Sequence, residues 1–214
     1  MKRVFIKTVL AAVALAAMGV ASAQDKTIKF ANQNAVGHPI VQGMEKFKEI
    51  VEKQSGGKIK VNVFPGGALG SDQANVSAIQ GGTLEMAAMN SGIFASQVKD
   101  FAVFDFPFMF ASGKEADVVV DGAFGKKMHS KLEEKGLVGL GYYELGFRHM
   151  SNSKRAINKV SDIDGLKLRV IPNPINVDWV KALGANPTPL PFPELYAALE
   201  QKAVDGQENP VATI

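Results

Sequence analysis

The sequence contains no cysteine, three histidines and one tryptophan, and beyond its N-terminus no apolar run is long enough to cross a membrane. Without cysteine the chain forms no disulfides and has no thiol nucleophile, so its stability must come from its core. The histidines show no metal-ligand spacing, and no serine lies in a G-x-S-x-G pattern. The glycine-rich stretch Pro65–Gly70 lacks both the P-loop ending and the dinucleotide-site spacing. These absences disfavour an enzyme, and no cofactor or metal is expected.

Residues 1–23 have the three parts of a secretory signal peptide. A basic start precedes the apolar core Val9–Val20, and the small-residue triplet Ala21-Ser22-Ala23 follows it. We predict cleavage before Gln24 and an exported, periplasmic protein with no stable membrane insertion. The alternative is an uncleaved N-terminal anchor, which the well-formed triplet disfavours.

The charge balance changes once the signal peptide is set aside. That segment holds three basic and no acidic residues, so the 24 basic and 21 acidic residues of the whole sequence become 21 and 21. The sequence pI of about 9.0 therefore describes the precursor. A neutral mature chain has no general electrostatic affinity for nucleic acid or for anionic membranes.

Hydrophobic periodicity predicts strands that alternate with helices. Period-two patterns and short apolar runs indicate strands at 26–33, 59–63, 84–90, 137–143, 166–171 and from 204 onward. Helical spacing between glycine and proline signals indicates helices at 39–53, 71–80, 124–135, 176–183 and 193–202. This order is typical of an α/β fold with a largely parallel sheet. The aromatic stretch 101–110 is most simply read as core, and 151–155 as a polar turn.

One internal similarity suggests two α/β halves built alike. Residues 78–85 and 198–205 both read as a helix end, a tight turn and the start of an apolar-acidic strand. Such a repeat would place Asn90 and Asn209 near strand ends of facing lobes. In open α/β sheets, ligands bind at the carboxyl ends of the strands.

Five motifs in the second half occur in an order that is specific for one family. They are Gly146-Phe147-Arg148, Lys154–Asn158, Asp164–Val170, Leu183–Pro189 and Val204–Pro210. With them the chain strongly resembles the solute-binding proteins of tripartite ATP-independent periplasmic (TRAP) transporters, the DctP family. The resemblance covers the whole mature chain, including Pro65–Gly70 and the Phe106-Pro107-Phe108 region.

The resemblance implies two α/β lobes, 24–145 and 146–214, around a cleft that closes on its ligand. It implies a receptor that performs no chemistry, captures a small organic-acid anion and delivers it to TRAP membrane subunits driven by an ion gradient. Arg169, in the Lys-Leu-Arg-Val strand, matches the arginine that holds the ligand carboxylate in the family. The further ligand-binding residues that it implies are Arg148, Asn209, Phe192, Asn90 and Gln33.

Taken without the family, each of these residues has a plainer interpretation. Arg169 alone would more often be a surface arginine on a strand, and Arg148 is equally ambiguous. Phe192 alone would be core and Asn209 a turn residue. Asn90 and Gln33 could each cap a helix or stabilise a turn.

Two departures from the family pattern change what we expect of the ligand and of the second lobe. In the sialic-acid-binding branch, a glutamate and an arginine match Asn90 and Ile93, which are neutral here. A smaller hydroxy, keto or dicarboxylic acid is therefore expected instead of sialic acid. Family members also continue well past Asn209-Pro210, so we expect this sequence to be a partial one with an incomplete second lobe.

Two other functions remain open from the sequence. The first is a binding protein of an ATP-driven importer, which shares the general cleft architecture. The second is a periplasmic enzyme acting on an organic acid. An adjacent gene for a nucleotide-binding subunit, instead of genes for TRAP membrane subunits, would favour the first. Recovery of unchanged ligand after long incubation would count against the second.

Overall fold

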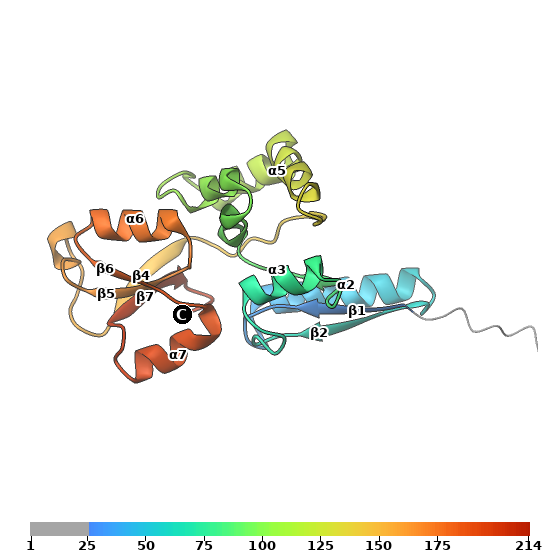
Figure 1. The fold of residues 1–214 in the computed structure, drawn as a ribbon, viewed down its shortest axis with the longest axis horizontal. Coiled ribbons are helices and arrows are strands. Elements are labelled where there is room, and N and C mark those ends of the chain that lie inside the picture. The colour runs from blue at the N-terminus through green and yellow to red at the C-terminus, as the bar shows by residue number, and fades with distance from the viewer. Residues whose placement is uncertain (1–25) are drawn as a thin grey trace, which may run out of the picture.

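The computed structural model describes residues 26–214, so the predicted signal peptide and its cleavage site lie outside the described residues. Two α/β lobes lie side by side, and a helical segment lies over the junction between them (Figure 1). Within residues 26–214, no helix combines the length and the apolar character that crossing a membrane requires.

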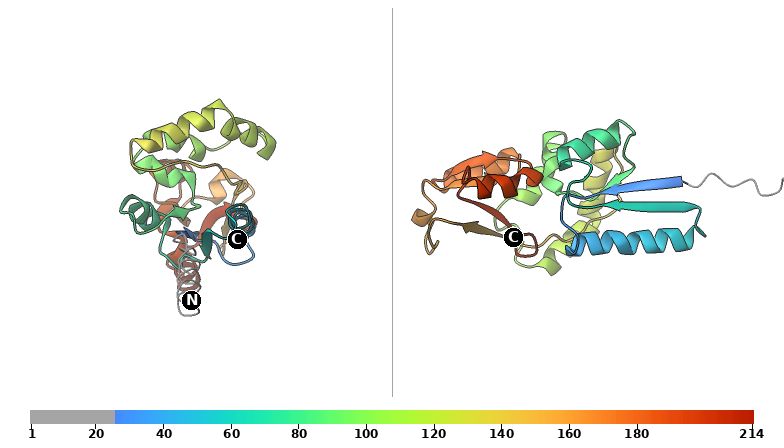
Figure 2. Two further views of the ribbon diagram at one scale, coloured as in Figure 1. Left: turned by 90° about the vertical axis from the view of Figure 1, so that its right-hand side faces the viewer. Right: turned by 90° about the horizontal axis from the view of Figure 1, so that it is seen from below.

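The first lobe has three parallel strands in the order β2-β1-β3. Figure 2 shows α2 and α3 on opposite sides of these strands. The elements are β1 (Lys26–Ala31), α2 (Pro39–Gln54), β2 (Ile59–Phe64), α3 (Asp72–Gln80) and β3 (Met86–Ala87). Helix α2 buries the apolar face that its sequence spacing predicts, with Met44 fully buried beside Phe30 of β1.

The second lobe has four strands in the order β4-β7-β5-β6. Only β4 runs antiparallel to its neighbour β7, and α6 and α7 cover opposite faces (Figure 1). The elements are β4 (Arg148–Asn152), β5 (Lys167–Val170), α6 (Pro174–Ala182), β6 (Asn186–Pro189), α7 (Phe192–Glu200) and β7 (Gly206–Pro210). The largely parallel α/β architecture predicted from the sequence is therefore confirmed.

The two lobes repeat one topology, β-α-β-α-β, in the strand orders β2-β1-β3 and β6-β5-β7. In both turns singled out above, two successive N–H groups donate to the carbonyl of a helical alanine, Ala78 and Ala198. After each turn an acidic residue, Glu85 or Asp205, accepts the backbone N–H of the adjacent strand. The donors are Lys29 and Lys167, each at 2.9 Å. The local similarity thus extends to equivalent tertiary contacts.

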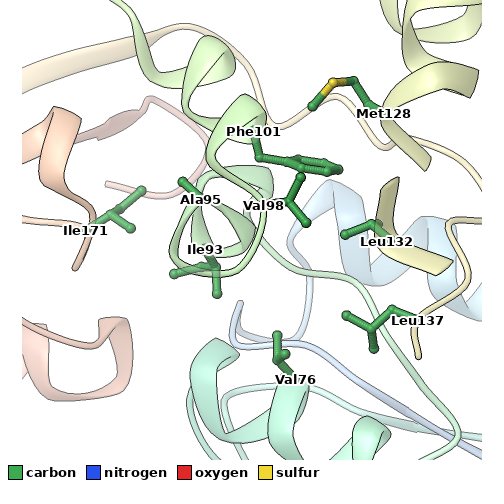
Figure 3. Close-up of a cluster of buried hydrophobic side chains, with 9 residues drawn as sticks. All are labelled: Val76, Ile93, Ala95, Val98, Phe101, Met128, Leu132, Leu137 and Ile171. Carbon is green, nitrogen blue, oxygen red and sulfur yellow. The ribbon is translucent and has the colours of Figure 1, made fainter. Parts of the chain in front are cut away.

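A helical segment joins the lobes. It comprises the 3₁₀ helices η1 (Ser91–Ser96) and η2 (Lys99–Asp105), and the α-helices α4 (Gly113–Asp121) and α5 (Ala123–Glu133). Its apolar cluster includes Ile93, Phe101 and Leu132, and Ile171 enters it from the chain that follows β5 (Figure 3). Since this core is shared, the lobe bounds 24–145 and 146–214 remain a prediction.

A buried carboxylate adds polar contacts to this junction. Asp105 accepts hydrogen bonds from the Nδ2 atoms of Asn173 (2.9 Å) and Asn176 (3.2 Å), at the start of α6. The same Nδ2 of Asn173 donates to the carbonyl of Gly92 at 2.9 Å. Burial raises the pKa of Asp105, and the amide hydrogen bonds oppose that shift. These contacts hold the helical segment against the second lobe.

Several predicted elements were wrong. Residues 137–143 are not a strand, since they belong to neither of the two described sheets. The strand predicted at 84–90 is reduced to Met86–Ala87, and 151–155 is partly the strand β4. The aromatic stretch is only partly core, since Phe101 is buried whereas Phe108 is fully exposed.

Strand β6 was missed because of its prolines, Pro187 and Pro189. Proline lacks an N–H and is depleted from sheet interiors. The order β4-β7-β5-β6 puts β6 at the sheet edge, where one side of the strand needs no partner. The position of β6 at the sheet edge therefore outweighs the low strand propensity of its prolines.

We predict that Gly206→Ala lowers stability by about 1–3 kcal/mol, because a Cβ there overlaps neighbouring backbone. The ideal Cβ position at Gly206 lies 2.1 Å from the carbonyl oxygen of Ser151 on β4. Thermal unfolding measures the loss, at about 2–4 °C per kcal/mol for a chain of this size. Gly141→Ala is the matched control, since its Cβ would meet open space. Equal melting temperatures of the two variants would contradict the prediction.

Candidate functional site

A cavity of about 660 Å3 is lined by residues of both lobes and of the extended chain 136–145. Its volume is in the range of small-molecule sites. All six candidate residues from the sequence line it: Gln33, Asn90, Arg148, Arg169, Phe192 and Asn209. Much of the remaining wall is apolar, including Phe30, Met86 and Leu137. The structure therefore brings the six together, while their roles remain predictions.

Arg169 is buried, at 2% exposure, in β5 at the centre of the second sheet. Its Nε donates to the carbonyl oxygen of Leu190 at 2.8 Å, and its guanidinium lies 5.8 Å from the ring centre of Phe192. Among residues 26–214, its two Nη groups have no recorded hydrogen-bond partner. The plainer interpretation of a surface arginine is thus wrong for its position, and the terminal donors are available to a ligand.

Burial lowers the pKa of Arg169 to about 10, through desolvation of the charged form. The nearby Glu208 and Asp72 favour the charge, whereas Arg148 opposes it. The side chain accordingly stays positive at neutral pH. A buried cation of this kind is costly unless an anion accompanies it.

Arg148 is already paired within the protein. It begins β4 and reaches across to β7, where its Nε and Nη2 donate to both carboxylate oxygens of Glu208. Its Nη2 also donates to the Oδ1 of Asn209 at 2.9 Å, and the Nδ2 of Asn209 donates to Gln207 at 2.6 Å. Glu208 and Asn209 are both 3% exposed. Arg148 and Asn209 therefore form one fixed polar cluster beside Arg169.

Gln33 and Asn90 follow the carboxyl ends of β1 and β3, as expected for a ligand site in a parallel sheet. Asn90 also caps η1, because its Oδ1 accepts the N–H of Gly92 at 2.9 Å. Its capping role, open from the sequence, is therefore present, and its amide NH2 remains available to a ligand. No hydrogen bond of the Gln33 side chain is recorded among the described residues.

Asp72, the first residue of α3, lies directly behind Asn90. It is 1% exposed, and its Oδ2 accepts the backbone N–H of Asn90 at 3.1 Å. Its Oδ1 has no partner among the described residues. Burial raises the pKa of Asp72 to about 7, against the opposing effects of the Asn90 hydrogen bond and the Arg169 charge.

Sequence reasoning missed Glu208 and Asp72. Glu208 lies in the last of the five motifs, but nothing in the sequence pairs it with Arg148, which is 60 positions away. Asp72 reads as an ordinary acidic residue in a helical first turn, which the helix dipole favours. Only its burial beside the cavity distinguishes it.

We predict that the titration of Asp72 makes the stability of the folded protein depend on pH. Its pKa is higher in the folded state than the unfolded value of 3.8, so the folded state binds the proton more tightly. The resulting stability is present below about pH 4 and is lost as pH rises through about 7. Asp72→Asn removes this loss and keeps an oxygen that accepts from Asn90. The melting temperature of the variant relative to wild type is therefore expected to rise between about pH 5 and pH 8. If the difference in melting temperature between the variant and wild type did not change with pH, the prediction would be contradicted.

Comparisons with known proteins agree on one family. The sequence profile of "Bacterial extracellular solute-binding protein, family 7" (DctP) matches residues 30–214. The 2,3-diketo-L-gulonate-binding periplasmic protein of Escherichia coli K12 is 33% identical over 94% of this chain and 61% of its own length. The C4-dicarboxylate-binding periplasmic protein of Rhodobacter capsulatus is 36% identical over 93% and 60%.

Solved structures give the same result. A sugar-acid-binding protein of Advenella mimigardefordensis, in complex with galactonate, is 45% identical and superposes with a TM-score of 0.88. The match covers 89% of this chain and 62% of that one. The chain spans 51% to 61% of the length of three of its curated relatives, and 38% of a fourth. Within residues 26–214, no group of three or more His, Cys, Asp or Glu side chains is placed to hold a metal ion.

Proposed function

Because this chain belongs to family 7 of the bacterial extracellular solute-binding proteins, the DctP family, we propose that it is the periplasmic receptor of a TRAP transporter. In this proposal the signal peptide directs export, and cleavage before Gln24 releases the receptor. The protein captures a small organic-acid anion and delivers it to the membrane subunits. It performs no chemistry on the ligand.

The observation that carries the proposal is the state of Arg169. It is a buried cation at a cavity lined by both lobes, and within the described chain its Nη groups have no hydrogen-bond partner. A planar guanidinium presents paired N–H donors that match the two oxygens of a carboxylate, and gives geometry as well as energy. A carboxylate is thus the group that would best balance this charge.

The other candidate residues have assigned places in this proposal. Arg148, held by Glu208, orients the ligand or shares its anion, and Asn209 positions Arg148. Phe192 packs against the apolar part of the ligand. Gln33 and Asn90 donate hydrogen bonds from the first lobe. Ligands in such cavities are generally held by a few fixed polar groups on an apolar wall.

The two lobes give the capture step its mechanism. Ligand contacts come from both lobes, so a bound anion stabilises the closed arrangement over the open one. Only the difference in affinity between the two arrangements can shift their populations. The membrane subunits would then recognise the closed form.

The names of relatives support an organic carboxylate. The relatives named above bind 2,3-diketo-L-gulonate and C4-dicarboxylates, and another solved relative, from Sulfurospirillum deleyianum, was crystallised with succinate. The two remaining alternatives, an ATP-driven importer and an enzyme, have no specific observation in their favour.

The direct test is a ligand screen of this chain by thermal shift and native mass spectrometry. The panel contains aldonic, uronic and dicarboxylic acids, together with neutral sugars and amino acids as controls. We expect stabilisation by at least one organic acid, which is recovered unchanged after long incubation. Stabilisation by neutral sugars or amino acids alone would overturn the proposal, and conversion of an acid would indicate an enzyme.

A further inference from the structure

Five buried or half-buried ionisable side chains form one network of charges where the two lobes meet. The charge of Arg169 favours the ionised form of Asp72. Arg169 in turn interacts electrostatically with Glu208 and Arg148, and both of these act on Asp105. When all five are ionised, three carboxylates face two guanidiniums. A ligand carboxylate at Arg169 therefore adds a fourth negative charge to a buried network that already has an excess of one.

The other ionisable side chains of the cavity wall do not offset this charge. Glu85 pairs with Lys29 at 3.8 Å, so the two together add no net charge. Burial lowers the pKa of His129, which is accordingly neutral at neutral pH. Burial also raises the pKa of Tyr142 to about 12 and that of Tyr143 above its usual value, so both remain neutral. The added negative charge must be balanced in another way.

Asp72 has a vacant position for a proton. Its Oδ2 accepts the backbone N–H of Asn90 at 3.1 Å, whereas its buried Oδ1 has no donor among the described residues. The Oδ1 of Asn75, three residues further along α3 and so on the same side of the helix, is likewise buried without a donor. Buried acceptors without donors are costly. A proton on the Oδ1 of Asp72 would turn one of these two acceptors into a donor.

The other two carboxylates of the network already have donors on both oxygens. Asp105 accepts from the Nδ2 atoms of Asn173 and Asn176, one on each oxygen. Glu208 accepts from Arg148 on both of its oxygens. Hydrogen bonds to both oxygens favour the ionised form. Within residues 26–214, the carboxylate on α3 is therefore the member of the network best able to take a proton.

A ligand carboxylate at Arg169 would change the surroundings of Asp72. Among the described residues, Arg169 is the one charged side chain recorded as acting on Asp72. The preceding loop 65–71, the rest of α3 and η1 contain no other charged residue. A bound anion would offset the charge of Arg169 and place a second carboxylate nearby. Two carboxylates that share one buried cation favour protonation of one of them.

We propose, on the basis of the function proposed above, that Asp72 takes up one proton from solution when an organic acid binds at Arg169. The proton binds the Oδ1, while the Oδ2 keeps its hydrogen bond to Asn90. One anion and one proton together leave the net charge of the network unchanged. Asp72 thus acts as a positioning residue, since it tunes Arg169 and holds Asn90 without touching the ligand.

The proposal sets the direction of the pH dependence. The pKa of Asp72 is about 7 in the ligand-free protein, so below that pH the proton is already present and affinity is constant. Above it, binding must include proton uptake, and affinity falls by up to about 10-fold per pH unit. Between about pH 6 and pH 8.5 the expected fall is about 10-fold or more.

Calorimetry in two buffers counts the protons. At one pH, the binding enthalpies in HEPES and in Tris differ by the number of protons taken up multiplied by the difference between the buffer ionisation enthalpies. The first probes are galactonate and succinate, followed by whichever acid of the panel binds. We expect most of one proton to be taken up at about pH 8 and almost none at about pH 5.5. No uptake by the wild type at about pH 8 would overturn the proposal without any variant.

Three variants identify the group that takes the proton. Asp72→Asn presents an amide that accepts from Asn90 and donates where the proton would lie, so it mimics the protonated state. It is expected to match the wild-type affinity at about pH 5.5, to bind about 10-fold or more tightly at about pH 8.5, and to take up no proton. Glu85→Gln and His129→Gln remove the other groups of the wall that titrate in this range, and both should keep the uptake. Uptake that persists in a folded Asp72→Asn protein, or disappears in His129→Gln, would assign the proton elsewhere and overturn the proposal.

The outcomes separate this inference from the proposed function. If an organic acid binds without proton uptake, the role of Asp72 is wrong and the receptor function stands. If no organic acid of the panel binds, the receptor function fails and this inference fails with it.

Discussion

Arg169→Ala is expected to abolish ligand binding, with an affinity loss of roughly 3–5 kcal/mol, or more than about 100-fold. The substitution removes a buried cation whose Nη groups have no partner among residues 26–214, and it leaves the ligand carboxylate desolvated and unpaired. Calorimetry with the acid identified in the screen measures the loss.

Arg169→Lys separates charge from geometry. An ammonium keeps the positive charge but presents no planar pair of donors, so intermediate affinity is expected. Melting curves of both variants control for folding, because Arg169 also donates to Leu190 and packs beside Phe192. Wild-type affinity in a folded Arg169→Ala protein would remove the central residue of the proposed site.

Glu208→Ala is expected to lower stability by roughly 3 kcal/mol, since removing one partner of a buried ion pair leaves the other uncompensated. The side chain of Glu208 is 4% exposed and that of Arg148 is 23% exposed, so solvent cannot easily replace the lost carboxylate. A decrease in melting temperature of about 6–12 °C corresponds to this loss.

A double variant tests whether the uncompensated charge of Arg148 causes the stability loss in Glu208→Ala. In Arg148→Leu/Glu208→Leu, both charges are absent, so the loss is expected to be smaller than in Glu208→Ala alone. Glu49→Ala, which removes the exposed partner of Lys46, is the surface control and should cost less than about 1 kcal/mol. If the loss in the double variant equals the sum of the losses in Arg148→Leu and Glu208→Leu measured singly, the Arg148–Glu208 pair does not act as a unit.

Most regular elements followed from local sequence. The face of α2 that carries Met44 and Phe47 has helical spacing, and β2 alternates apolar and polar residues. Such periodicity works because a helix or strand repeats its geometry along the chain. It failed at 137–143 and at β6, where the outcome depends on which strand, if any, lies alongside.

The candidate site was predictable only in part. The family motifs marked Arg169 and Asn209, and the structure places both at one cavity with Gln33 and Asn90 from the other lobe. In the first sheet, Gln33 and Asn90 lie together because the carboxyl ends of parallel strands meet at one edge. The arrangement of the two lobes then brings them to the same cavity as Arg169 and Asn209. Residue spacing alone could not have assembled them.

The sequence by itself determined the α/β alternation and the absence of common catalytic motifs, and it predicted the export signal and the arginine most suited to a carboxylate. Only the tertiary structure decided which charges are already paired. Glu208 neutralises Arg148, Asp72 is buried behind Asn90, and the Nη donors of Arg169 have no partner in the part of the chain that the structure describes. The reason is physical, because the energy of an ionisable group depends on its burial and its neighbours in space. Neither quantity is encoded by position along the chain.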